Sequence, residues 1–90
     1  MQQETNRAID YILSHKIQFA IVSRGYSYKE VAQAINLSPS TLSCIITRRT
    51  SCTLTNLFLI SQFLNYPIHF FLDTFEIKQE LYKTATNPLF

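Results

Sequence analysis

The chain contains a single glycine, Gly25, and this scarcity constrains its fold more than any other feature of the sequence. Tight hairpin turns usually need glycine, so a chain with one glycine and three prolines has few ways to connect the strands of a sheet. Leu, Ile, Phe and Ala are abundant instead. The sequence therefore predicts an all-α fold. Its 90 residues are enough for one domain, which buries roughly 60–65% of the surface of the extended chain.

Several classes of protein are disfavoured by the sequence. The longest apolar runs, such as 57–60 and 70–72, are far shorter than the roughly 20 residues that cross a bilayer. Residues 1–10 lack the basic and then apolar layout of a signal peptide. No glycine-rich phosphate loop, carboxylate pair or nucleophile elbow is present. We therefore expect a cytoplasmic protein that is neither a membrane protein nor an enzyme.

The cysteines and histidines do not form a recognisable site. Cys44 and Cys52 give no disulfide framework and no metal-ligand spacing. His15 and His69 have no Cys, His or acidic cluster at ligand spacing, so we expect both to be partly buried and to bind no metal. We expect Cys44 to be inert, and Cys52, in a polar loop, to be the more reactive thiol. No cofactor is expected.

Positive charge is concentrated in the middle of the chain. Residues 24–53 contain four basic residues and one acidic residue, whereas the rest of the chain contains four basic and five acidic residues. The uneven distribution produces a local positive potential although the net charge is only +2. This is a modest electrostatic footprint for a nucleic acid.

The first helix is predicted over residues 5–24, where apolar side chains occupy well over half of the circumference. Only a narrow polar strip remains, formed by Arg7, Asp10, Ser14 and Gln18. A helix this apolar has to be covered from two sides. Gly25 ends it, because glycine adopts the left-handed conformation that follows many helices.

Capping signals define the remaining helices. Ser27 and Glu30 form a capping box. Ser38 is placed as an N-cap, with Pro39 at the first helical position, where a missing N–H costs nothing. Thr53 caps a further helix. The predicted helices after the first span residues 28–35, 39–47 and 54–65, followed by a fifth from Pro67 and a last one capped by Asp73 and Glu76, with residues 84–90 frayed.

The segment 28–47 has the apolar spacing of a helix-turn-helix. Two short helices that cross steeply need apolar side chains at fixed positions on both. These positions are occupied by Val31, Ala32, Ile35, Leu37, Leu42 and Ile45. Ala32 falls where the helices approach most closely. Asn36 falls in the turn, where a positive φ is needed and asparagine tolerates it.

The run RGYSYKEVAQAINLSPSTLSCIITRR, followed by TLTNLFLISQFLNYPIHFFL, resembles the helix-turn-helix domains of the Cro and lambda-repressor type, the XRE family. The resemblance implies a compact five-helix domain over residues 17–72, with its motif at 28–47. In that family the third helix lies in the major groove, and homodimers bind pseudo-palindromic operators. Residues 1–16 would extend the first helix, and residues 73–90 would add a C-terminal segment with an extra helix that could serve dimerisation.

The resemblance also assigns residues to the DNA interface. Those expected to face base edges are Ser38, Pro39, Ser40, Thr41, Ser43 and Cys44. Those expected to contact the DNA backbone are Tyr28, Lys29, Thr47, Arg48 and Arg49. Two alternatives stay open, because Tyr28 can simply pack on the domain surface and the two arginines can simply solvate a loop. The reading helix has no Arg, Asn or Gln, so specificity would depend on Ser and Thr, on DNA shape and on the loop arginines.

The function implied is a sequence-specific DNA-binding regulator, and a repressor rather than an activator because the chain has no room for a separate effector domain. The alternative is a protein-interaction module on the same scaffold, for instance an antitoxin or a binder of another regulator. The chain has more apolar side chains than one core stripe needs, among them Phe58, Phe63, Phe70 and Phe75. We expect either the C-terminal segment or another subunit to cover them. We expect a homodimer through the fifth helix and the segment after it, aided by the extension of the first helix.

Overall fold

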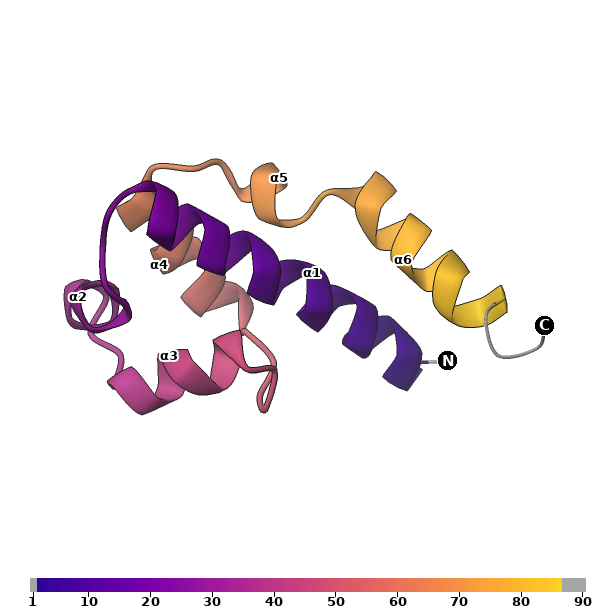
Figure 1. The fold of residues 1–90 in the computed structure, drawn as a ribbon, viewed down its shortest axis with the longest axis horizontal. Coiled ribbons are helices and arrows are strands. Elements are labelled where there is room, and N and C mark those ends of the chain that lie inside the picture. The colour runs from indigo at the N-terminus through magenta and orange to yellow at the C-terminus, as the bar shows by residue number, and fades with distance from the viewer. Residues whose placement is uncertain (1, 87–90) are drawn as a thin grey trace.

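The structure is a computed structural model that describes residues 2–86, with side chains described for residues 3–83. This part of the chain contains six α-helices and no strand (Figure 1), which confirms the predicted all-α fold. The helices are α1 (Gln2–Ser23), α2 (Tyr28–Ala34), α3 (Pro39–Ile46), α4 (Leu54–Leu64), α5 (Ile68–Phe71) and α6 (Thr74–Thr86). Their order agrees with the prediction. α6 continues to Thr86, into the segment that was expected to fray, and residues 87–90 lie outside the described part.

α1 is the central element of the molecule. α3 and α4 pack on one side of it, and α5 and α6 pack on the other (Figure 1). This arrangement confirms that α1 is covered from two sides. Ser14, which was expected in the polar strip, is buried, and its hydroxyl donates to the carbonyl of Tyr11 at 3.0 Å. Phe19 and Val22 remain 59% and 66% exposed, so the cover is incomplete near the C-terminal end of α1.

The core lies where α1 meets the other helices. Its largest fully buried side chains are Phe71, Ile17, Ile21, Leu42, Leu57, Ile60, Leu64 and Val31. Ala32 is also fully buried, and a small side chain is needed there because α2 and α3 pack directly on each other. In Figure 1, α2 is seen almost end-on while α3 lies across the view, so the two helices cross steeply. This is the helix-turn-helix arrangement that the spacing predicted.

Four helices end with one residue in the left-handed conformation. These residues are Gly25, Asn36, Arg48 and Asn65, with φ of 79°, 61°, 63° and 60°. In each case the N–H of the following residue donates back to a carbonyl of the preceding helix, and the bonds run from Tyr26 to Ile21, Leu37 to Ala32, Arg49 to Cys44 and Tyr66 to Ser61 at 2.8–3.2 Å. This Schellman arrangement satisfies carbonyls that the helix leaves without a partner. Arg48 is the unexpected member, because a Cβ raises the energy of this conformation and arginine lacks the short polar side chain that lets asparagine tolerate it.

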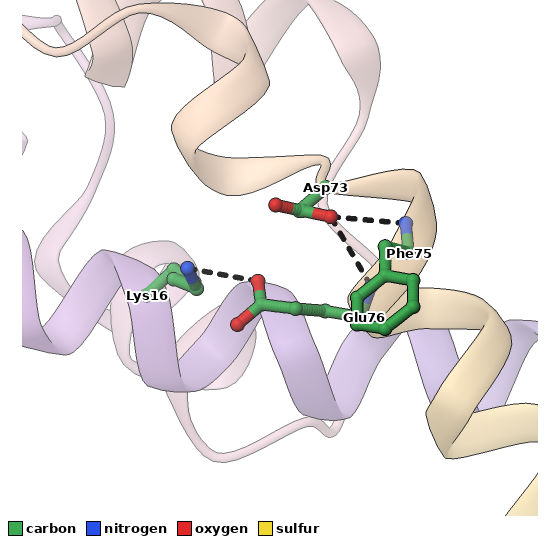
Figure 2. Close-up of polar contacts among 4 residues, drawn as sticks. All are labelled: Lys16, Asp73, Phe75 and Glu76. Atoms are coloured by element: carbon green, nitrogen blue, oxygen red, sulfur yellow. Dashed lines mark hydrogen bonds and ion pairs between the residues drawn. The ribbon is translucent and has the colours of Figure 1, made fainter.

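α6 is fastened to α1 at its first turn (Figure 2). Oδ1 of Asp73 accepts from the backbone N–H groups of Phe75 and Glu76 at 2.9 and 3.2 Å, which confirms the predicted cap. The Glu76 carboxylate forms an ion pair of 2.9 Å with Lys16 of α1. Lys16 also lies 4.5 Å from the ring centroid of Phe70 in α5. α6 then runs antiparallel to the N-terminal half of α1, and the two helices extend the molecule to 44 Å along its longest axis.

Candidate nucleic-acid interface

α3 has one buried and one exposed side. Leu42 and Ile45 face the core with 0% and 4% exposure. The exposed residues on and beside the helix are Ser38, Pro39, Ser40, Thr41, Ser43 and Thr47, whereas Cys44 is half-buried. The helix lies at the lower edge of the molecule in Figure 1, away from α5 and α6. The segment after Ser38 is therefore helical, and its polar side chains face solvent.

The hydroxyl groups of α3 are not equally available. Oγ of Ser38 accepts from the N–H of Thr41 at 3.1 Å and lies 2.7 Å from the Thr41 hydroxyl. The hydroxyl of Thr47 donates to the carbonyl of Ser43 at 2.8 Å. These bonds cap the two ends of the helix and occupy part of the capacity of Ser38, Thr41 and Thr47. The Ser40 hydroxyl lies 3.3 Å from Oγ of Ser38, a long contact, so the exposed hydroxyl groups of Ser40 and Ser43, one turn apart along the helix, keep most of their capacity for a ligand.

The start of α2 supplies one exposed cation next to this surface. Ser27 and Glu30 form the predicted capping box, since Glu30 Oε1 accepts from the Ser27 N–H at 2.8 Å and Ser27 Oγ accepts from the Glu30 N–H at 3.1 Å. Lys29 is exposed. Tyr28 is half-buried and packs against the core. Its packing role is therefore observed, and its phosphate contact stays a prediction.

Arg48 and Arg49, directly after α3, differ in their surroundings. The guanidinium carbon of Arg48 lies 5.4 Å from the ring centroid of Tyr11, and Nη1 lies 3.5 Å from the hydroxyl oxygen of Ser14. Its side chain thus lies against the N-terminal half of α1, along an open hollow of about 470 Å³ that Asp10 also lines. Arg49 is exposed. No local pattern around Arg48 indicated the contact with Tyr11, because the two residues are far apart in the sequence.

Arg24, which contributed to the predicted positive charge of residues 24–53, is engaged with the end of α4. Its Nε donates to the carbonyl of Leu64 at 2.7 Å, and Nη2 donates to the carbonyl of Asn65 at 3.1 Å. The guanidinium also lies 4.3 Å from the ring centroid of Tyr66. Arg24 therefore fixes the C-terminal end of α4 to α1. The positive charge near α3 comes from the other three basic residues of this segment.

Cys52 is less reactive than the sequence suggested. Its side chain is half-buried against the core. Burial, and then the negative charge of Asp10, raise the pKa of the Cys52 thiol to about 11. Because the thiolate is the nucleophile, a raised pKa slows its reactions at neutral pH. The expectation that Cys52 would be the more reactive thiol is therefore not supported.

Within residues 3–83, no three side chains from His, Cys, Asp and Glu come together in a way that could hold a metal ion. His15 and His69 are both exposed, which corrects the expectation of partial burial. His15 contacts the ring of Tyr11 edge-on, with centroids 4.5 Å apart. Of the helices in residues 2–86, none has the length and apolar content needed to cross a membrane.

Comparison with known families identifies the fold that these residues form. The pattern of a family described as Helix-turn-helix matches residues 17–71. The chain belongs to the helix-turn-helix family of the Cro and lambda-repressor type. Members of this XRE family are DNA-binding transcription regulators. The match begins in the middle of α1 and ends with α5, so it leaves out the N-terminal half of α1 and all of α6. No curated protein and no solved structure is similar enough to this chain to count as a match.

Proposed function

We propose that the protein is a transcriptional repressor that binds a pseudo-palindromic operator as a homodimer, with α3 in the major groove. The observation that carries this proposal is the orientation of α3. Leu42 and Ile45 hold one side in the core, and the hydroxyl-bearing side faces solvent at the edge of the molecule. A helix held in this way has the dimensions and exposure that major-groove recognition requires.

The chemistry of α3 limits how the operator could be read. Ser40 and Ser43 carry hydroxyl groups that can donate to or accept from any base edge, so each distinguishes bases only weakly. Cys44 is half-buried beside them, and Pro39 adds apolar contact. Without a bidentate side chain, we infer that much of the specificity comes from sequence-dependent DNA shape. Affinity would come from the phosphate contacts of Lys29, Arg48 and Arg49 together with Tyr28 and Thr47.

A homodimer would place two α3 helices about 34 Å apart, one turn of DNA, so that both half-sites are bound at once. Exposed apolar side chains of α1 next to α5 support a contact between two copies. Phe19 and Val22 are exposed on α1, and the ring of Phe19 lies 6.1 Å from that of Phe70 in α5. We therefore assign the dimer contact to this surface of α1 and α5. Occupation of the operator would then block polymerase.

The proposal is tested by selecting bound sequences from a random pool of DNA duplexes with the full chain. We expect a recovered site with two inverted half-sites about one helical turn apart. The affinity for that site should fall steeply as salt increases, because phosphate contacts release counterions. Absence of binding to every duplex at low salt would refute the proposal and favour a protein-interaction module on the same scaffold.

The role of the loop arginines is tested with the double variant Arg48→Ala/Arg49→Ala. Each lost phosphate contact should reduce the slope of log K against log salt by about 0.9. Lys78→Ala/Lys83→Ala is the matched control, since both lysines are exposed on α6, which packs on the side of α1 opposite α3. An unchanged slope in the arginine variant, or an equal loss in the control, would remove the loop arginines from the interface.

A further inference from the structure

α6 presents two chemically different faces. The half-buried residues are Glu76, Ile77, Glu80 and Leu81, and the Lys16–Glu76 ion pair shows that this side faces α1 (Figure 2). The opposite side, here called the outer face of α6, consists of Phe75, Lys78, Gln79, Tyr82 and Lys83, all of which are exposed. The outer face lies outside residues 17–71, the part that matches the helix-turn-helix family. Its composition is therefore not explained by the DNA-binding domain.

The apolar part of the outer face consists of two aromatic side chains, Phe75 and Tyr82, at a spacing that suits contact with a helix. Phe75 and Tyr82 are 68% and 70% exposed, and they border a shallow hollow of about 380 Å³. Two helical turns separate them, which corresponds to about 10 Å along the axis. Both rings are thus mostly open to solvent, while the Lys16–Glu76 ion pair joins the first turn of α6 to α1. Two aromatic side chains spaced in this way suit the apolar stripe of a partner helix.

The polar part of the outer face is positive. Lys78 and Lys83 line the hollow together with Gln79, and no acidic side chain within residues 3–83 lines it. Lys83 lies 3.9 Å from Glu80, yet its side chain remains 74% exposed, so this pair is loose. An apolar hollow between two ammonium groups is complementary to a segment that carries apolar side chains beside carboxylates.

We propose that the outer face of α6 docks a partner protein through an acidic amphipathic helix. Apolar side chains of that helix fill the hollow between Phe75 and Tyr82, and its carboxylates pair with Lys78 and Lys83. In Figure 1, α6 lies above α1 and α3 lies below it, so such a partner is held on the side of the molecule away from α3. The inference goes beyond DNA binding and does not depend on it.

A second copy of the chain fits the outer face poorly. Two-fold packing through this face would bring Lys78 and Lys83 against the same lysines of the other copy, and like charges in an interface oppose association. The chain also has few acidic groups to offer in return, because most are already engaged. Asp10 accepts from Ser51, Glu30 belongs to the capping box of α2, Asp73 caps α6, and Glu76 pairs with Lys16.

A bilayer or a nucleic acid is also less suitable. Adsorption to an anionic membrane usually requires a cluster of four to eight basic residues, whereas the outer face has two. Duplex DNA offers phosphates but no apolar segment to fill the space between Phe75 and Tyr82. A protein helix supplies both carboxylates and apolar side chains at the required spacing.

The test uses the full chain and three fluorescein-labelled 16-residue peptides, with binding followed by fluorescence anisotropy. The first peptide carries Leu at helical spacing on one face and Glu elsewhere. The second replaces every Glu by Lys, and the third replaces every Leu by Ala. We expect the Leu/Glu peptide to bind at least tenfold more tightly than either of the others.

Variants of exposed residues then locate the site. Phe75→Ala/Tyr82→Ala should weaken binding of the Leu/Glu peptide at least tenfold, and Lys78→Glu/Lys83→Glu should reverse the preference toward the Leu/Lys peptide. Leu54→Ala is the matched control, because Leu54 is 71% exposed on another helix, and its binding should be unchanged. Circular dichroism checks that each variant keeps its helix content. An unfolded variant would lose binding of every peptide, whereas a change of preference from the Leu/Glu to the Leu/Lys peptide requires a folded outer face. Absence of that change in a folded Lys78→Glu/Lys83→Glu variant would therefore contradict the proposal.

Three results would overturn the proposal. Equal binding of all three peptides would show that the outer face has no preference for acidic apolar helices. Conversion of a dimer to a monomer by Phe75→Ala/Tyr82→Ala, measured by sedimentation, would show that a second copy occupies the face. Loss of binding to phosphatidylglycerol vesicles or to duplex DNA in the same variant would assign the face to a membrane or to nucleic acid. Failure of the chain to bind any duplex would leave the peptide result standing, so the two proposals are tested separately.

Discussion

Substitutions of Arg48 allow the energy of its left-handed backbone conformation to be measured separately from the effect of its side-chain charge. Arg48 has φ of 63° and follows α3 where glycine is usual. A residue with a Cβ raises the energy of this conformation by about 1–2 kcal/mol, and glycine removes that cost. Glycine also increases the entropy of the unfolded chain, which lowers stability by about 0.4–1 kcal/mol. Arg48→Gly should therefore be more stable than Arg48→Ala by about 0.5–1 kcal/mol.

The comparison of glycine with alanine is informative because both variants lose the same side-chain contacts. Each removes the interactions of Arg48 with Tyr11 and Ser14, so the difference in stability between them reports the backbone. For a domain of this size it corresponds to about 2–8 °C in Tm, measurable by thermal unfolding followed by circular dichroism. Gln18, exposed in the middle of α1, is the control. The variant Gln18→Gly should be less stable than Gln18→Ala by about 1 kcal/mol, because glycine is unfavourable within a helix.

The same two variants also test the DNA contact. Both remove one positive charge next to α3, so both should weaken binding to the selected duplex to the same extent, although their Tm values differ. The reasoning about the backbone would be refuted if Arg48→Gly were no more stable than Arg48→Ala. The reasoning about the phosphate contact would be refuted if neither variant changed the salt dependence of DNA binding.

Three further predictions concern packing, ionisation and the attachment of α6. Ala32→Phe should lower the free energy of unfolding by about 1–3 kcal/mol in chemical denaturation, because Ala32 has no exposed surface where α2 meets α3. Cys52 has a pKa of about 11 against an ordinary value of 9.0, so the folded state holds this proton more tightly than the unfolded state. Ionisation of Cys52 should not change the free energy of unfolding below pH 9.0 and should lower it as pH rises toward 11. The variant Cys52→Ser should lack this fall. An equal fall in the variant and the parent chain would exclude the thiol as its cause. Lys16→Met should lower the free energy of unfolding by about 0.5–1 kcal/mol, since the ion pair with Glu76 is only partly buried, and should increase amide hydrogen exchange in α6. Equal exchange in the variant and the parent chain would contradict the role of Lys16 in holding α6.

Local signals predicted most of the fold. The caps at Ser27, Ser38 and Thr53 and the left-handed residues Gly25 and Asn36 act within one turn of the chain, so their effects can be read from neighbouring residues. The steep crossing of α2 and α3 was also predictable, because it depends on a short and regular apolar spacing. These elements account for the position and orientation of α3.

Contacts between distant segments were not predictable in the same way. Arg24 looked like part of a positive surface, but it binds the carbonyl groups at the end of α4. Cys52 lies in a loop of polar sequence, but the fold places it against the core. In both cases the neighbour that decides the chemistry of the side chain is many residues away. Periodicity and capping contain no information about such a neighbour.

The placement of Arg48 against α1 is compatible with a phosphate contact when the energies are compared. A cation near an exposed aromatic ring contributes about 0.5–1 kcal/mol, and 5.4 Å from the Tyr11 ring is close to the limit of that interaction. The 3.5 Å separation from the Ser14 hydroxyl is long for a hydrogen bond. A charge-assisted hydrogen bond, such as one to a phosphate, contributes about 1.5–3 kcal/mol. A phosphate contact would therefore outweigh the contacts of Arg48 with α1, so these contacts do not argue against the proposed role of Arg48.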